Sequence, residues 1–259
     1  MSEDARFSVV IPTRNRPELL ARALHSALAQ RHVGFDILVV DDGAGEGAEA
    51  ARRLAGREVE ILRTGGAGQV PARNLGVRSA RGRWIAFLDD DDWWAADDHL
   101  AGLAAELSRG AGLAYASGRI VREGPEGAVL EEIALDARCD PASIRQDNTL
   151  LVPGVGYARA LHERFGLYDE SLTIYWDWDW YLRLSAGGVV FAASSGNAVR
   201  VSVREGTASA PDNVAVRAAE LDRLCRKHGL TGVTLKNHDV IAHEQAARKM
   251  RKTHLTSRC

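Results

Sequence analysis

Residues 89–92 are four consecutive aspartates, and they follow directly on an apolar run at residues 84–88. Like charges at such close range raise one another's pKa values or cost stability unless a cation lies among them. Carboxylate oxygens suit Mg²⁺ or Mn²⁺, and such sites leave coordination positions open for substrate phosphates. The run therefore predicts a divalent metal site. The alternative is a solvated acidic loop that caps a helix beginning near Asp97.

A second group of carboxylates lies in an aromatic segment, where Asp177 and Asp179 alternate with Trp176, Trp178 and Trp180. Burial among indole rings would raise a carboxyl pKa, which suits a general base working near neutral pH. The alternative is that both aspartates cap the helix that follows. We favour the base for Asp177 and the cap for Asp179.

The tryptophans themselves could bind an acceptor. Trp93, Trp176 and Trp178 stand next to carboxylates, and their rings could stack on a sugar face. Packing in the core is the alternative for each of them.

The elements that must position these residues follow from the periodicity of the chain. We predict strands at residues 7–11, 37–40, 59–62, 84–88, 113–117, 118–121, 129–133, 189–192 and 199–203. We predict helices from Pro17 onward and at residues 46–54, 70–79, 158–165, 214–228 and 238–252. The alternation predicts an α/β fold with a doubly wound, mostly parallel sheet, whose ligands bind at the carboxyl ends of the strands.

Polar residues gather at those strand ends. Thr13 follows the first apolar run, Asp41 and Asp42 follow the second, and the aspartates at residues 89–92 follow a later one. We therefore expect all of them at one rim of the sheet.

The charge, the cysteines and the apolar runs of the chain argue against several classes of protein. The 259 residues carry 33 basic and 35 acidic side chains, a formal charge of -2, which does not favour nucleic acid or an anionic membrane. The three cysteines show no CxxC pairing, the chain opens without a signal peptide, and no apolar run has the length of a membrane span. We expect a cytoplasmic protein that is not an integral membrane protein and binds no nucleic acid.

The chain divides into three regions by pattern. Residues 1–110 carry the regular strand–helix alternation, residues 111–210 have shorter strands and build the acceptor side, and residues 211–259 form a helical extension. The stretch at residues 204–213 is predicted to be a flexible loop. The C-terminal helices either cover the acceptor site or form a contact in a homodimer.

Four sequence blocks carry a family resemblance: VIPTRN at residues 10–15, VVDDG at 39–43, ARNLG at 72–76 and FLDDDDWW at 87–94. In this order they resemble the family 2 glycosyltransferases, which have the Rossmann-like GT-A fold. FGLYDE at residues 165–170, followed by YWDWDWYLR at 175–183, is similar to the family's acceptor-side signature. The resemblance covers about residues 7–205.

The resemblance implies roles for individual residues. The donor, a nucleoside diphosphate sugar, would be bound by Pro12, Thr13, Arg14, Asp41, Asp42, Arg73, Asn74, Asp89 and Asp90. Purely structural alternatives remain: Asp41 and Asp42 would end a strand in a turn, and Arg73 and Asn74 would cap a helix. Asp91, with Asp89, would hold Mn²⁺ or Mg²⁺.

On the acceptor side, Asp177 matches the general base of inverting members, and Trp176 stands where the family has an acidic residue. In some members of the family, a residue late in the chain contacts the metal or the phosphate, and His238 and His243 lie in such a segment. The simpler interpretation is that each is a surface histidine.

The activity that the resemblance implies is metal-dependent transfer of a sugar with inversion at the anomeric carbon. The family's commonest donors are uridine diphosphate sugars, and the acceptor would be a hydroxyl group of a small molecule or a glycan. Two alternatives stay open: a non-catalytic nucleotide- or carbohydrate-binding protein, favoured by Trp176, and a nucleotidyltransferase. The second should have a glycine-rich loop after the first strand, which PTRN at residues 12–15 lacks.

Overall fold

The computed structural model describes residues 6–196, 198–204 and 214–256. Residues 205–213, most of the predicted flexible loop, lie outside the described residues, whereas Arg204 ends a strand. None of the described helices combines the length and the apolarity that crossing a membrane requires.

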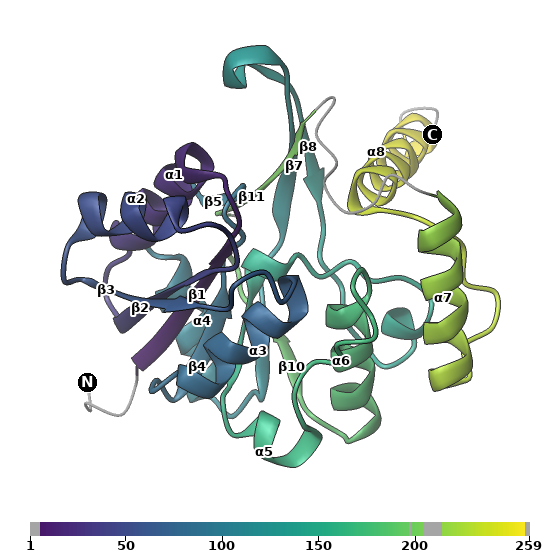
Figure 1. The fold of residues 1–259 in the computed structure, drawn as a ribbon. Coiled ribbons are helices and arrows are strands. Elements are labelled where there is room, and N and C mark those ends of the chain that lie inside the picture. Colours follow the sequence, from purple (N-terminus) through teal and green to yellow (C-terminus); the bar gives the residue numbers. More distant parts are fainter. Residues whose placement is uncertain (1–5, 197, 205–213, 257–259) are drawn as a thin grey trace.

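The first third of the chain alternates strands and helices (Figure 1). Its elements are β1 (Arg6–Thr13), α1 (Pro17–Leu28), β2 (Gly34–Asp41), α2 (Glu46–Ala55), β3 (Val59–Arg63), α3 (Gln69–Ser79) and β4 (Trp84–Phe87). Pro17 opens α1 because its fixed φ suits the first helical turn. Leu20, Ala23, Leu24 and Ala27 then form the buried face of that helix.

A seven-stranded sheet forms the centre of the fold, in the order β10-β6-β9-β4-β1-β2-β3. It is completed by β6 (Leu113–Tyr115), β9 (Val155–Ala158) and β10 (Phe191–Ala193). All its pairings are parallel except those of β9, which runs antiparallel to β4 and β6. The predicted α/β fold with a mostly parallel sheet is therefore confirmed.

A smaller, four-stranded sheet has the order β5-β11-β7-β8. Its strands are β5 (Trp93–Trp94), β7 (Gly118–Glu123), β8 (Val129–Leu135) and β11 (Val199–Arg204). The β7–β8 hairpin rises out of the molecule in Figure 1. Because β5 belongs to this sheet while β6, β9 and β10 belong to the large one, the regions predicted at residues 1–110 and 111–210 interleave.

The remaining helices are α4 (His99–Ser108), α5 (Leu161–Phe165), α6 (Trp176–Ala186), α7 (Val214–His228) and α8 (His238–Thr256). The predicted helix at residues 158–165 is wrong at its start. Val155–Ala158 is extended because it pairs with strands on both sides, so α5 begins only at Leu161. In Figure 1, α7 and α8 lie on the side of the molecule opposite α1 and α2.

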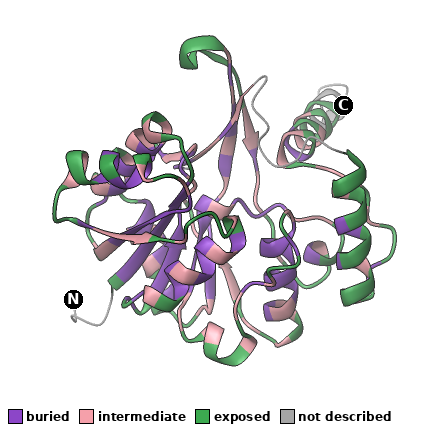
Figure 2. Cartoon of the chain, viewed as in Figure 1, coloured by how far each residue is buried: buried purple, intermediate pink, exposed green. Residues whose placement is uncertain are grey.

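The core lies on both faces of the large sheet (Figure 2). Successive residues of a strand point to opposite faces, so Val9 and Ile11 belong to one buried cluster and Val10 to the other. The second of these clusters, around Val10, also takes in the aromatic side chains of α6, among them Trp180. Packing of this sheet therefore fixes both the strand ends and the segment that carries Asp177.

Candidate active site

The four aspartates follow β4 at the carboxyl edge of the sheet, as predicted. Asp90 is 1 % exposed, and its Oδ2 accepts a hydrogen bond from Thr13 Oγ1 at 2.7 Å. Arg16 bridges two of the carboxylates, with Nη2 2.6 Å from Asp90 Oδ1 and Nη1 2.8 Å from Asp91 Oδ2. Burial raises the pKa of Asp90 to about 6, against the opposing charge of Arg16.

The outer members of the run are held from two different sides. Asp89 pairs with Arg73 of α3, and Asp92 Oδ1 accepts from the Ser202 backbone N–H at 2.9 Å in β11. Burial raises the pKa of Asp92 well above its usual range, and the charge of Asp91 acts in the same direction. Two arginines therefore balance part of the negative charge of the run, and hydrogen bonds tie the loop to both sheets.

The residues predicted to hold a metal offer two carboxylates with open surface. The side chains of Asp89 and Asp91 are 25 % and 21 % exposed. In the described part of the chain, no three His, Cys, Asp or Glu side chains are placed to share one metal ion. One or two carboxylates suffice for Mg²⁺ or Mn²⁺ when substrate phosphates and water complete the shell, so this donor set fits such an ion.

Asp42, predicted to bind the donor, lies at the same rim. Its carboxylate accepts from the Thr64 hydroxyl and from the Gly68 N–H at 3.1 Å, and Arg14 lies 3.8 Å away. These bonds hold the turn that precedes α3 against the end of β2. Thr13 and Asp42 therefore come together, as the strand pattern predicted, and Arg14 lies beside Asp42.

Asp41 and Asn74 have their polar atoms engaged within the protein. Asp41 is fully buried, and its two oxygens accept from the N–H groups of Gly43 and Ala48, both at 2.8 Å, at the start of α2. Asn74 donates to the Tyr168 carbonyl at 3.1 Å and accepts from the Tyr168 N–H at 3.0 Å. Both side chains therefore hold neighbouring segments of the backbone in place. Pro12, also predicted to contact the donor, is buried within β1.

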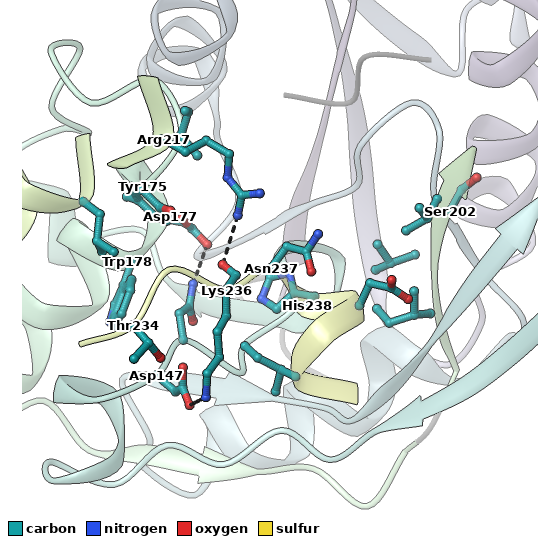
Figure 3. Close-up of a pocket in the computed structure, with 18 of the residues that line it drawn as sticks. Asp147, Tyr175, Asp177, Trp178, Ser202, Arg217, Thr234, Lys236, Asn237 and His238 are labelled. Carbon is teal, nitrogen blue, oxygen red and sulfur yellow. Dashed lines mark hydrogen bonds and ion pairs between the residues drawn. The ribbon is translucent and has the colours of Figure 1, made fainter. Parts of the chain in front are cut away.

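Asp177 lies in the first turn of α6, 7 % exposed, and lines a cavity of about 490 Å³ (Figure 3). Asn148 Nδ2 donates to its Oδ2 at 2.8 Å. Burial raises the pKa of Asp177 to about 6, opposed by hydrogen bonds and by the charge of Arg73. A carboxyl group with this pKa is ionised at neutral pH and can accept a proton from a bound hydroxyl.

Arg73 connects the aspartate rim to α6, the helix that carries Asp177. Its Nη1 donates to the Gln69 carbonyl at 3.1 Å, it pairs with Asp89, and its guanidinium carbon lies 4.5 Å from the centroid of the Trp176 ring. One arginine therefore contacts the predicted donor side and the helix of the predicted base.

The three tryptophans predicted to bind an acceptor have different surroundings. Trp178 lines the cavity while its Nε1 donates to the Ile144 carbonyl at 2.6 Å. Trp176 is 5 % exposed beneath Arg73 and against Phe87, which leaves little of its ring for a sugar. Trp93 lies beneath Arg22, whose guanidinium carbon is 3.9 Å from the ring centroid.

Asp179 is not the helix cap that we predicted. It is completely buried and pairs with Lys227 at 2.7 Å, His228 at 2.8 Å and Arg183 at 3.0 Å. Two of these partners belong to α7, so Asp179 anchors the C-terminal extension onto α6.

Part of the cavity wall was not predicted from the sequence. Asn148, Arg217, Lys236 and Asn237 all line the cavity, and no local pattern marks them. His238 is also in the wall and is not a surface histidine; burial lowers its pKa to about 4, against hydrogen bonds with the backbone of Asn148 and Leu150. His243 is about half exposed, beside Asp239.

The chain is similar to known glycosyltransferases in sequence and in fold. The family model described as glycosyl transferase family 2 matches residues 8–152. An uncharacterized glycosyltransferase of Bacillus subtilis, YwdF, is 30% identical over 245 residues, which cover 92% of this chain and 90% of the relative. The amylovoran biosynthesis glycosyltransferase AmsB of Erwinia amylovora is 34% identical over 104 residues, which cover 37% of this chain and 34% of AmsB.

Among solved structures, residues 1–349 of TarS from S. aureus in complex with UDP-GlcNAc have a TM-score of 0.67 at 18% identity. The match covers 92% of this chain and 69% of the TarS chain. At this identity, the likeness shows a shared fold.

Proposed function

Because the chain belongs to glycosyl transferase family 2, we propose that it moves a sugar from a nucleoside diphosphate to an acceptor hydroxyl with inversion at the anomeric carbon. The observation that carries the proposal is the position of Asp177. Its buried carboxyl group lies in a cavity, and Arg73 joins its helix to the aspartate rim.

The donor would bind at the rim of the large sheet. Thr13, Arg14, Asp42, Arg73, Asp89 and Asp90 meet there, where an α/β sheet of this topology binds its ligands. UDP-GlcNAc is the first donor to test, because the TarS structure with this fold holds it.

A divalent metal is part of the proposal. Asp91 and Asp89 would hold Mn²⁺ or Mg²⁺, which supplies Lewis-acid neutralisation of the charge that develops on the leaving diphosphate. Arg16 now pairs with Asp91, so it would have to share or yield that carboxylate.

The chain's own groups account for the rest of the chemistry. Asp177 accepts the proton of the acceptor hydroxyl while the hydroxyl oxygen forms a bond to the anomeric carbon. The bond from that carbon to the diphosphate oxygen breaks on the opposite face, with its electron pair leaving on the diphosphate. Asn148 holds the Asp177 carboxylate in one orientation throughout.

Replacing the base tests the proposal. Asp177→Asn keeps the shape of the side chain, so UDP binding in the presence of Mn²⁺ should stay within about twofold while transfer falls by about 10²-fold or more. Asp147→Asn is the matched control, since Asp147 lines the same cavity but pairs with Lys236 at 3.4 Å. We expect it to retain most of the transfer.

Two results would contradict this assignment. Wild-type turnover by Asp177→Asn would remove Asp177 as the base. UDP binding without any UDP-GlcNAc hydrolysis or transfer above background would favour a non-catalytic binding protein.

A further inference from the structure

The cavity beside Asp177 is partly built by the C-terminal extension. Arg217 and Leu221 come from α7, and His238, Asp239 and Ile241 come from α8. Figure 3 shows the Arg217 guanidinium and the Asp177 carboxyl group both reaching into this space. The extension therefore contributes side chains to the site where an acceptor would meet the base.

Most basic side chains of the cavity wall are already paired with carboxylates. Arg122 pairs with Asp239 at 2.9 Å, Arg204 with Glu123 at 3.0 Å, and Lys236 with Glu244 at 2.9 Å and Asp147 at 3.4 Å. Their charges are balanced within the protein.

Arg217 differs from these three. Its Nη2 donates to the Lys236 carbonyl at 3.0 Å, and no carboxylate in the described chain lies within ion-pairing distance. It lies near the Tyr175 hydroxyl, whose pKa is raised by burial against the opposing charge of Arg217. A guanidinium group has five N–H donors, so a half-buried one held by a carbonyl has donors left for a ligand.

We propose that Arg217 binds an anionic group, a carboxylate or a phosphate, on the acceptor whose hydroxyl is presented to Asp177. This inference rests on the proposed transferase function and adds a class of acceptor to it. An anionic acceptor would be repelled by ionised Asp177, and a cation at the wall offsets that repulsion. The planar fork of arginine also fixes the orientation of an oxyanion through paired hydrogen bonds.

Calorimetry on the full chain loaded with UDP and Mn²⁺ tests the inference with three probes: glycerol 3-phosphate, D-glucuronate and the neutral sugar D-glucose. At least one anionic probe should bind more tightly than glucose, and the tighter anion identifies phosphate or carboxylate as the group recognised. Arg217→Gln should weaken binding of the tighter anionic probe by about tenfold or more, because one charged hydrogen bond is lost. Arg217→Lys should weaken binding of this probe less.

Arg226→Gln is the matched control, because Arg226 lies on the same helix but is exposed and pairs with Asp222 at 3.9 Å. It should bind the anion as the wild type does. If glucose binds as tightly as both anions, or if Arg217→Gln and the wild type bind the anion equally, the inference is wrong. UDP binding, measured first in every variant, reports separately on the proposed function, since Arg217→Gln should leave it unchanged.

Discussion

Arg73 stacks on Trp176: its guanidinium carbon lies 4.5 Å from the centroid of the indole ring, while the same group pairs with Asp89. The resemblance led us to expect an acidic residue at position 176. An aromatic ring can hold the arginine through a cation–π contact without placing a second negative charge beside Asp177. The substitution is therefore compatible with a working base.

The pKa of Asp177 predicts the pH dependence of transfer. Because burial raises it to about 6, the Asp177 carboxyl group is ionised above this pH and protonated below it. We expect kcat/KM for transfer to fall about tenfold for each pH unit below about 6. A pH–rate profile measured with saturating Mn²⁺ checks this, and a limb near pH 4 would show that the buried carboxyl group is not the titrating base.

Removing the charge of Arg73 should shift that profile. Its positive charge lowers the pKa of Asp177, so Arg73→Met should move the acidic limb to higher pH. The variant should also bind UDP less tightly, because Asp89 loses its partner. Arg78→Met, a change in the last turn of the same helix, serves as the control. An unmoved limb would mean that Arg73 and Asp177 are not electrostatically linked.

Asp91→Ala should abolish the dependence of UDP affinity on Mn²⁺. The carboxylate is partly exposed at the rim, and an alanine offers the metal no oxygen. Asp97→Ala removes a nearby exposed aspartate and should leave the metal dependence intact. Calorimetry measures the affinity for UDP with and without Mn²⁺ in each protein. If Asp91→Ala has the same two affinities as the wild type, the metal assignment is wrong.

Loss of Asp179 should weaken the attachment of α7 to the fold. Asp179→Ala leaves Lys227, His228 and Arg183 without their shared carboxylate in a buried setting, which costs about 3–5 kcal/mol in the free energy of unfolding. Asp222→Ala, an exposed aspartate of α7, should change it by less than about 0.5 kcal/mol. Urea unfolding of both variants measures the difference, and equal midpoints would exclude the anchoring role.

His99 should make the fold sensitive to acid. It is buried against Trp94 with its Nε2 3.1 Å from the Pro153 carbonyl, and burial lowers its pKa from 6.5 to about 4. As the pH falls, His99 is protonated in the unfolded chain before it is protonated in the folded protein. The free energy of unfolding therefore decreases as pH falls from about 6.5 toward 4. Asp90 and Asp177, whose pKa values are raised, act with the opposite sign over the same range.

Comparison with His99→Gln isolates the histidine, because glutamine cannot titrate and the aspartates are common to both proteins. The difference in melting temperature between the wild type and the variant should shrink as pH falls from 7 toward 4. A difference that is independent of pH would show that His99 is not buried in its neutral form.

The sequence predicts those parts of the site that follow directly on apolar strands. Thr13, Asp42 and Asp90 meet because parallel strands end at one rim, and strands of alternating or wholly apolar residues are easy to identify. Val155–Ala158 was missed because pairing with two distant strands, not its local pattern, makes it extended. Asn148 contacts Asp177 from 29 positions away in the chain, and Arg217, 40 positions away, lines the same cavity. No periodicity encodes such long-range proximity.

The interleaving of the two sheets has a consequence for engineering. A chimera joined at residue 110 would separate β6, β9 and β10 from the strands they complete, and β5 from its partner β11. The regions predicted at residues 1–110 and 111–210 therefore cannot be exchanged independently of each other. Residues 214–256 add no strand to either sheet but do line the cavity, so this is the region in which to exchange sequence when the lining of the proposed acceptor site is to be altered.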